Sequence, residues 1–411
     1  MLYRLRDAGF DAFLVGGCVR DLLLGRRPKD FDLATNAKPE EVRRLFKNCR
    51  LIGKRFRLAH ILFGPEIIEV ATFRTHHENA TETQHGHMHQ GMIIRDNVFG
   101  SIEDDARRRD FSINALYYNI ADFTVLDYTN AMDDIKHRRL RIIGDPEKRF
   151  HEDPVRLIRA ARFAGKLNLT ISPETETPLK ELSYLLQNVS PARLFQEVLK
   201  FFEEGALLNT FHLFRKYKLV EQLFPETAGS LTHENALKLI EDALSNTDQR
   251  LKEGKTVSPA FLFSIFLWHP IQAHATQEAA KGLPLYVAFE KAIYLVMKKQ
   301  IDRLSIPRKL QVTIRDICFL QHRFTQRFGS RPYRVLEHQR YRAGYDLLML
   351  RATAGEPVKD LYDWWTEFHD ADPTVREKMI KSAAKATPGK KPRRSRKFSK
   401  PRMPRPENTA N

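Results

Sequence analysis

Two short stretches decide the fold of the N-terminal half of this chain: Val15-Gly16-Gly17-Cys18-Val19-Arg20-Asp21 and Lys29-Asp30-Phe31-Asp32-Leu33-Ala34-Thr35. The first places a Gly-Gly turn directly after the apolar run 13–15. Two consecutive glycines let the backbone approach a ligand closely, and the N–H groups of such a turn form a site for anions. Residues 19–24 predict a short helix whose N-terminus faces the same anion.

The second stretch places two carboxylates two residues apart. If residues 31–34 form a strand, positions i and i+2 project from one face, so Asp30 and Asp32 point the same way. Two close carboxylates repel each other unless a cation lies between them. Oxygen ligands of this kind suit Mg²⁺, which proteins hold through one or two carboxylates together with phosphate oxygens. A phosphate-binding turn followed by a metal-binding pair indicates nucleotidyl transfer.

Three motifs in order resemble the family that contains bacterial poly(A) polymerases and CCA-adding enzymes. They are the Gly-Gly and Asp-Phe-Asp stretches above, Arg107-Arg108-Arg109-Asp110-Phe111-Ser112-Ile113-Asn114-Ala115-Leu116, and Glu152-Asp153-Pro154-Val155-Arg156-Leu157-Ile158-Arg159-Ala160-Ala161-Arg162-Phe163. The resemblance to the poly(A) polymerase branch extends from the N-terminus to about residue 370. It implies a nucleotidyltransferase that works without a template.

The first and second motifs are expected to bind the triphosphate and the metal ions. Gly16, Gly17 and Arg20 would lie beside the phosphates, and the arginine cluster 107–109 suits a triphosphate. The resemblance implies that Arg109 contacts the nucleotide and that Asp110 is either a third active-site carboxylate or a ribose-binding residue, with Asn114 four residues on. Glu69, on a predicted strand 67–73, is the other candidate for the third acid, or it is simply an exposed strand residue.

The third motif is expected to recognise the base. Asp153 suits the N-cap of a helix with Pro154 at its first position, which places Arg156 and Arg159 on one face. The resemblance assigns base recognition to Glu152, Asp153 and Arg156. An acceptor for the adenine N6 amine and a donor to N1 are needed, and cytosine presents a similar edge.

These residues predict attack of an RNA 3′-hydroxyl on the α-phosphate of ATP, with pyrophosphate leaving. Asp30 and Asp32 would hold two Mg²⁺ roughly 3.5–4 Å apart. Addition of AMP to RNA 3′ ends without a template, which promotes RNA turnover, is therefore the predicted function.

We predict an α+β architecture with four parts. Residues 1–138 form a mixed α/β nucleotidyltransferase head with a small, antiparallel-rich sheet, because strand-like runs flank turns at 64–65 and 121–122. From residue 139 amphipathic helical patterns replace the strands. Residues 139–210 are a helical neck that binds the base and RNA, 211–370 a helical body that binds RNA, and 371–411 a disordered basic tail.

The charge distribution favours an RNA partner. The net charge is +17, and residues 381–405 carry 11 Lys or Arg and no acid. The basic side chains of such a tail can bind the phosphates of the RNA backbone. The predicted RNA-binding residues are, in the head, Lys54 and Arg55, and, in the tail, Lys390, Lys391, Arg393, Arg394, Arg396 and Lys397.

Two alternative functions remain open. The first is a CCA-adding enzyme that acts on tRNA, and the basic, aromatic stretch 51–61 favours the poly(A) branch over it, because that stretch resembles the signature of the branch. The second is a non-catalytic RNA-binding protein, for which metal-binding carboxylates would serve no purpose.

The cysteines and the apolar segments bear on location and partners. Cys18, Cys49 and Cys318 lie far apart and form no C-x-x-C pair, which suggests a reducing compartment. No apolar run is long enough to span a membrane, and no signal peptide is evident. We therefore expect a cytoplasmic monomer that binds ATP and the 3′ ends of mRNA and small RNA, with RNA-decay proteins as further partners and no membrane contact.

Overall fold

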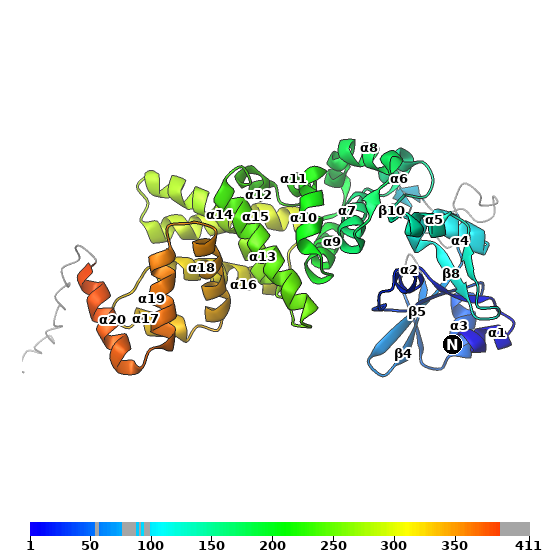
Figure 1. The fold of residues 1–411 in the computed structure, drawn as a ribbon, viewed down its shortest axis with the longest axis horizontal. Helices are drawn as coiled ribbons and strands as arrows, with labels where there is room; N and C mark the ends of the chain where they lie inside the picture. Colours follow the sequence, from blue (N-terminus) through cyan, green and yellow to red (C-terminus); the bar gives the residue numbers. More distant parts are fainter. Residues whose placement is uncertain (54–56, 76–87, 90–91, 94–98, 387–411) are drawn as a thin grey trace, which may run out of the picture.

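The structure is a computed structural model of the 411-residue chain, and it describes residues 1–53, 57–75, 88–89, 92–93 and 99–386. Figure 1 shows the N-terminal head at one end of an elongated molecule, with helices α17–α20 at the opposite end. The predicted arrangement of a mixed α/β head followed by helices is confirmed.

The head is built on one seven-stranded sheet with the order β3-β4-β5-β2-β1-β8-β9. Its strands are β1 (Ala12–Val15), β2 (Asp32–Thr35), β3 (Cys49–Ile52), β4 (Leu58–Phe63), β5 (Glu66–Thr72), β8 (Leu116–Asn119) and β9 (Val125–Asp127). Only β2 and β5 pair in parallel, so the sheet is antiparallel-rich as predicted. Val15 ends β1 and lies opposite Asp32, the first residue of β2, which brings the glycine turn and the aspartate to the same end of the sheet.

Helices cover both faces of this sheet. The helical segments of the head are α1 (Leu2–Asp7), α2 (Gly17–Leu23), α3 (Pro39–Leu45), α4 (Ile102–Arg108), the 3₁₀ turn η3 (Ser112–Asn114) and α5 (Ala131–Lys136). Because side chains alternate along a strand, Leu33 packs with Leu5 of α1 and Val42 of α3, whereas Ala34 packs in the cluster that holds Ala106 of α4. Position 32 shares the face of Ala34, which is the face covered by α4.

The rest of the described chain is almost entirely helical. Its helices are α6 (Pro146–Glu152), α7 (Val155–Leu167), α8 (Pro173–Glu181), η4 (Ser183–Asn188), α9 (Pro191–Glu203), α10 (Leu207–Lys216), α11 (Leu219–Leu223), α12 (Pro225–Ser230), α13 (Glu234–Lys252), α14 (Pro259–Ala280), α15 (Leu285–Leu304), α16 (Arg308–Phe324), α17 (Arg331–Leu336), α18 (Tyr341–Thr353), α19 (Lys359–Asp370) and α20 (Pro373–Ala386). Short strand pairs are formed by β6 (Met88–His89) with β7 (Met92–Ile93), and by β10 (Arg139–Leu140) with β11 (Thr170–Ile171).

One large apolar core joins the predicted neck and body. It includes Phe111 at the edge of the head, Phe201 and Phe202 of α9, and Ala354 after α18. Packing is therefore continuous across residue 210, and the division into segments 1–138, 139–210 and 211–370 stays a prediction. Among the helices of the described residues, none is long and apolar enough to cross a membrane.

The prediction that disorder begins at residue 371 is wrong for the first part of that segment, because Pro373–Ala386 forms α20. The Asp372 carboxylate accepts hydrogen bonds from the backbone N–H groups of Thr374 and Val375, at 2.8 and 3.0 Å, and so caps the first turn. Met379 and Ile380 pack against the cluster that contains Trp365. A local cap and a short apolar stripe outweigh the basic composition there. Residues 387–411 lie outside the described residues.

Trp365 anchors this C-terminal cluster, and its replacement tests the packing. Its side chain is fully buried, and its indole N–H donates to the Phe324 carbonyl oxygen at 2.9 Å. We expect Trp365→Ala to lower the free energy of unfolding by about 3–5 kcal/mol, since it leaves a large cavity. Trp364 is only partly buried and stacks on Phe368, so Trp364→Ala is the matched control. Equal losses for the two variants in thermal melts would contradict this assignment.

Candidate active site

The glycine turn is closed tightly against an arginine. Gly16 has φ 77° and ψ −127°, and its N–H donates to the Leu116 carbonyl oxygen at 3.1 Å. A Cβ at this position would lie 3.3 Å from Nη1 of Arg109. Backbone conformation and space therefore both require glycine here. The turn connects β1 to α2, as the sequence predicted.

Negative charge is concentrated where β2 begins. Asp32 pairs in register with Glu69 on the parallel strand β5, and Asp30 lies two residues before it. Asp30 and Asp32 both remain exposed to solvent. Although Asp32 stays open to solvent, the protein around it reduces the hydration of its carboxylate. This loss of hydration and the charges of Glu69 and Asp30 raise the pKa of Asp32 to about 6, whereas the charge of Arg109 acts to lower it. A cation bound here would relieve this repulsion.

The donor set fits Mg²⁺ only when substrate supplies further oxygens. Across the described ranges, no group of three or more His, Cys, Asp or Glu side chains is placed to hold a metal ion unaided. Mg²⁺ is typically bound through one or two carboxylates plus phosphate oxygens, and Asp30 and Asp32 can provide the protein's part. Next to them, Nε2 of His60 lies 3.3 Å from Oε1 of Glu69.

Arg109 is held by a buried acid that the sequence analysis missed. The Asp105 carboxylate is almost fully buried and accepts hydrogen bonds from Nε and Nη2 of Arg109, at 3.2 and 3.0 Å. It also accepts one from the Tyr117 hydroxyl at 2.7 Å. The signal for this contact was present, because Asp105 precedes Arg109 by one helical turn and such pairs meet on a helix surface. These contacts orient Arg109 next to the glycine turn.

Asp110 belongs to a second network, in which its carboxylate is fully engaged. Nε and Nη2 of Arg159 donate to Oδ2 at 2.8 and 2.5 Å, while the Asn114 amide and the Phe111 N–H donate to Oδ1 at 3.2 and 2.8 Å. Burial disfavours its ionisation, but Arg159 and these donors outweigh that effect and lower its pKa to about 2. This carboxylate therefore links the head to α7.

Arg20 extends the same network and is only 5% exposed. Its Nη1 donates to the Asn114 side-chain oxygen at 2.5 Å, and its Nε donates to Asp21 at 2.8 Å. The sequence predicted Arg20 beside the phosphates. In the structure its guanidinium is buried and bonded to Asn114, which in turn donates to Asp110. It still lies next to the glycine turn, since a Cβ on Gly17 would be 3.5 Å from Nη2 of Arg20, and the phosphate-binding role stays a prediction.

The third motif begins its helix one residue later than predicted. Pro154, not Asp153, is the N-cap of α7, and Asp153 also ends α6. Its carboxylate still accepts a long hydrogen bond, 3.4 Å, from the Val155 N–H. The physical reason is that α6 and α7 follow each other directly, so that Asp153 is the C-cap of α6 and Pro154 is the N-cap of α7. The sequence pattern does not reveal α6.

The predicted base-recognition residues are held by one contact within the motif and by two partners outside it, Arg149 and Arg193. Oδ2 of Asp153 accepts from Nη2 of Arg193 on α9 at 3.0 Å. Nη1 of Arg156 donates to the Arg149 carbonyl oxygen at 2.6 Å and to Oε2 of Glu152 at 3.2 Å. Sequence analysis missed both partners, and Arg193 is forty residues from Asp153, where no local pattern could point to it.

Arg149 also connects this region to the arginine cluster of the head. Its Nη2 donates to the carbonyl oxygens of Arg108 and Arg109, each at 2.7 Å, and its Nη1 donates to Glu152 at 2.7 Å. The second and third motifs are thereby joined through backbone and side-chain contacts.

The predicted RNA-binding residues lie outside the described residues, and their prediction stays untested. They are Lys54, Arg55, Lys390, Lys391, Arg393, Arg394, Arg396 and Lys397.

Comparison with known proteins gives matches along most of the chain. A family model described as the poly A polymerase head domain matches residues 12–141. Models described as a probable RNA and SrmB-binding site of polymerase A and as the polymerase A arginine-rich C-terminus match residues 168–231 and 281–399. Poly(A) polymerase I of Salmonella typhimurium is 47% identical over 419 residues, which cover 100% of this chain and 89% of that protein.

CCA-adding enzymes are more distant. That of Lactobacillus helveticus is 37% identical over 229 residues, which cover 56% of this chain and 55% of that protein. Among solved structures, the CCA-adding enzyme of Bacillus stearothermophilus in complex with CTP is similar in fold, with a TM-score of 0.55 and 25% identity. The match covers 94% of this chain and 80% of that one.

The close approach of Gly16 to Arg109 generates a prediction with a built-in control. Gly16→Ala and Gly25→Ala both place a side chain at positive φ, which costs about 1–3 kcal/mol of stability, but nothing lies within 4 Å of a Cβ at Gly25. We expect both variants to melt earlier and only Gly16→Ala to raise KM for ATP, because only it displaces Arg109. Equal KM values for the two variants in steady-state assays would show that this contact does not serve the nucleotide.

Proposed function

Since this chain belongs to the poly(A) polymerase I family and adds AMP from ATP to RNA 3′ ends without a template, we propose that Asp30 and Asp32 bind the catalytic Mg²⁺. The single observation that carries this assignment is the concentration of carboxylates at the start of β2, beside the glycine turn and Arg109. Nucleotidyl transfer needs a phosphate-binding element and a metal-binding element at one point, and this end of the sheet provides both.

The reaction joins the RNA 3′-oxygen to the α-phosphorus of ATP and breaks the bond from that phosphorus to the bridging oxygen of pyrophosphate. Bound Mg²⁺ supplies positive charge that favours the ionised hydroxyl and the departing pyrophosphate. Asp30 and Asp32 hold that charge in place. The turn at Gly16 and Gly17 lets the triphosphate approach the backbone, and Arg109, oriented in advance by Asp105, adds a fixed cation.

Glu69 is the better candidate for a third acid than Asp110. Glu69 lies in register with Asp32 and contributes to the raised pKa of that residue. In Asp110, in contrast, both carboxylate oxygens already accept hydrogen bonds, from Arg159, from the Asn114 amide and from the Phe111 N–H. We assign Asp110 the role of holding the head and α7 together, so that the base and phosphate sites keep a fixed separation.

Base recognition falls to the start of α7 and the end of α6. Asp153 would accept a hydrogen bond from the N6 amine of adenine, and Arg156 would donate to N1. Arg193 holds Asp153, and the Arg149 carbonyl and Glu152 hold Arg156, so both groups are presented in fixed orientations. Because Asp153 and Arg156 are held in one orientation, they favour the same base in every round of addition.

The substrates would be the 3′ ends of mRNA and small RNA, and their polyadenylation would promote RNA turnover. The three cysteines are free thiols and buried, which fits a reducing compartment such as the cytoplasm.

Removal of either metal-binding carboxylate tests the central assignment. We expect Asp30→Asn and Asp32→Asn each to lower AMP addition by at least about 100-fold, since the metal contributes several kcal/mol of transition-state stabilisation. Asp122→Asn, in the exposed turn between β8 and β9, is the matched control. The measurement is single-turnover extension of a labelled RNA with ATP and Mg²⁺. Near-normal rates in either site variant would refute the metal assignment.

Nucleotide choice tests the base-recognition assignment. With each NTP supplied alone, we expect repeated addition from ATP and little from CTP, GTP or UTP. Each mismatched edge leaves a buried polar group unpaired, at about 1–3 kcal/mol per group. Asp153→Ala should reduce the preference for ATP over GTP more than it weakens RNA binding. Addition of two C residues and then one A to tRNA, with no further growth, would instead establish a CCA-adding enzyme.

A further inference from the structure

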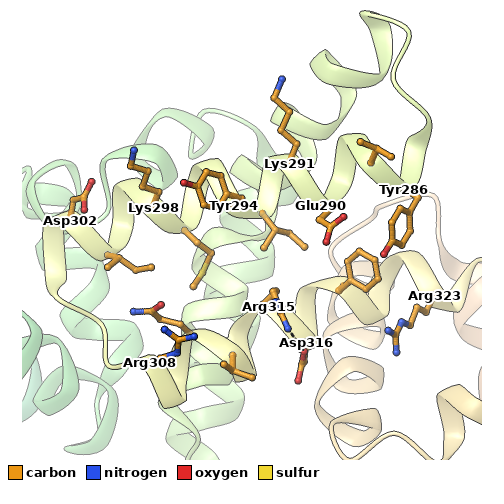
Figure 2. A pocket seen from close by; sticks show the side chains of 17 residues that line it. Tyr286, Glu290, Lys291, Tyr294, Lys298, Asp302, Arg308, Arg315, Asp316 and Arg323 are labelled. Atoms are coloured by element: carbon orange, nitrogen blue, oxygen red, sulfur yellow. Dashed lines mark ion pairs between the residues drawn. The ribbon is translucent and has the colours of Figure 1, made fainter.

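A long open groove runs between α15 and α16, on the helical part of the molecule. Its volume is about 860 Å³, and its lining combines cations with aromatic rings. Figure 2 shows side chains from both helices along it, with Tyr286 and Arg323 at one end and Asp302 and Arg308 at the other. No residue of the candidate active site lines this groove.

The cations of the groove are only partly neutralised. Five basic and three acidic side chains line it. Lys291 is paired with the buried Glu278 at 2.7 Å, and Arg315 is 3.9 Å from Asp316. Within the described part of the chain, Lys298, Arg308 and Arg323 have no carboxylate partner. Arg323 also lies over the Phe319 ring, 5.4 Å from its centroid. The five cations outnumber the three acids by two, so the groove keeps a net positive charge that suits a polyanion.

Two tyrosines on α15 offer flat, exposed rings beside these cations. The side chain of Tyr294 is 64% exposed and that of Tyr286 is 48% exposed. Tyr286 is braced edge-on by Phe319 of α16, at 5.2 Å between ring centroids. The two tyrosines are eight residues apart, about 12 Å along the helix axis. Nucleobases stack on exposed aromatic rings of this kind.

The length of the groove matches a short run of nucleotides. From Tyr286 to Asp302, α15 rises about 24 Å, which accommodates roughly four to seven nucleotides of a single strand. A positively charged groove interleaved with aromatic rings is the arrangement that binds single-stranded nucleic acid without sequence preference. Protein interfaces also favour Tyr, Met and Arg, but they are depleted of Lys, Glu and Asp, and all three of these line this groove.

We propose that the groove between α15 and α16 binds single-stranded RNA upstream of the 3′ end that is being extended. Tyr286 and Tyr294 stack on bases, while Lys298, Arg308 and Arg323 contact phosphates. The inference rests on the proposed function in so far as the enzyme must hold RNA that it lengthens. The groove then adds affinity for long substrates and none for a primer too short to reach it.

The test compares the variant Tyr294→Ala/Arg308→Ala/Arg323→Ala with the control Tyr3→Ala/Lys238→Ala, which removes an exposed tyrosine and an exposed lysine elsewhere. Binding of labelled oligo(A) of 20 nucleotides is measured by fluorescence anisotropy over a salt series, without ATP, and the rate of AMP addition to primers of 5 and 20 nucleotides is measured separately. For the 20-mer we expect the groove variant to bind at least about tenfold more weakly. Its salt slope should fall by roughly 1.4, for two lost phosphate contacts. For the 5-mer, the rate of AMP addition should stay within twofold, because a primer whose 3′ end lies in the active site is too short to reach the groove.

Two results would overturn the proposal. An unchanged affinity for the 20-mer would show that the groove does not bind RNA and would point to another kind of partner, such as a protein helix. An equal fall in the rate of AMP addition to the 5-mer and the 20-mer would show a general effect and not an upstream site. Because binding is measured without turnover, loss of the Asp30 and Asp32 assignment would leave this result unaffected, and the two proposals fail separately.

Discussion

Repulsion among carboxylates at the start of β2 is the constraint on which the rest of the site depends. Asp32 faces Glu69 across a parallel strand pair, with Asp30 two residues away. Loss of hydration, followed by repulsion from Glu69 and Asp30, raises the pKa of Asp32 to about 6 against the effect of Arg109. A sheet held together by apolar contacts on both faces can tolerate this local cost. Sites for charged substrates commonly store such strain, since the cation and the triphosphate that bind there relieve it.

Buried ion pairs then fix the distance between the phosphate site and the base site. Asp110 of the head is bonded to Arg159 of α7, and Arg149 is bonded to carbonyl groups of the head and to Glu152. Removing one partner would leave the other buried and unpaired, which is much more costly than losing an exposed pair. The same continuity holds further along, where one apolar core joins the head's edge to the helical body. These buried ion pairs and the shared core would have to break before the phosphate site and the base site could move apart.

The features that the sequence predicted well are those whose chemistry is local. The turn at Gly16 and the strand that carries Asp32 follow from residues within a few positions of each other, and the structure places both at one end of the sheet. Because β2 begins at Asp32, Asp30 lies before the strand, and a shared direction of the two carboxylates stays a prediction. The partner of Asp153 could not be predicted, because Arg193 meets it only after α7 and α9 have packed together. The helix Pro373–Ala386 was missed for a different reason. The prediction of disorder rested on the average composition of the whole basic segment, whereas one N-terminal cap and a few apolar side chains are enough to form this helix at its start.

The central claim is that Asp32 is ionised at a cost that bound metal repays, and melting temperatures test it without any assay of activity. A raised pKa means that folding is disfavoured by the charge of Asp32 above pH 6, and that this effect fades as the pH falls toward 4. The metal-free Asp32→Asn variant should therefore melt above the unaltered protein at pH 8, with the gap shrinking toward pH 4. Addition of Mg²⁺ with ATP at pH 8 should raise the melting temperature of the unaltered protein and not that of the variant. A variant that melts lower at pH 8, or that gains equally from Mg²⁺ and ATP, would contradict the account.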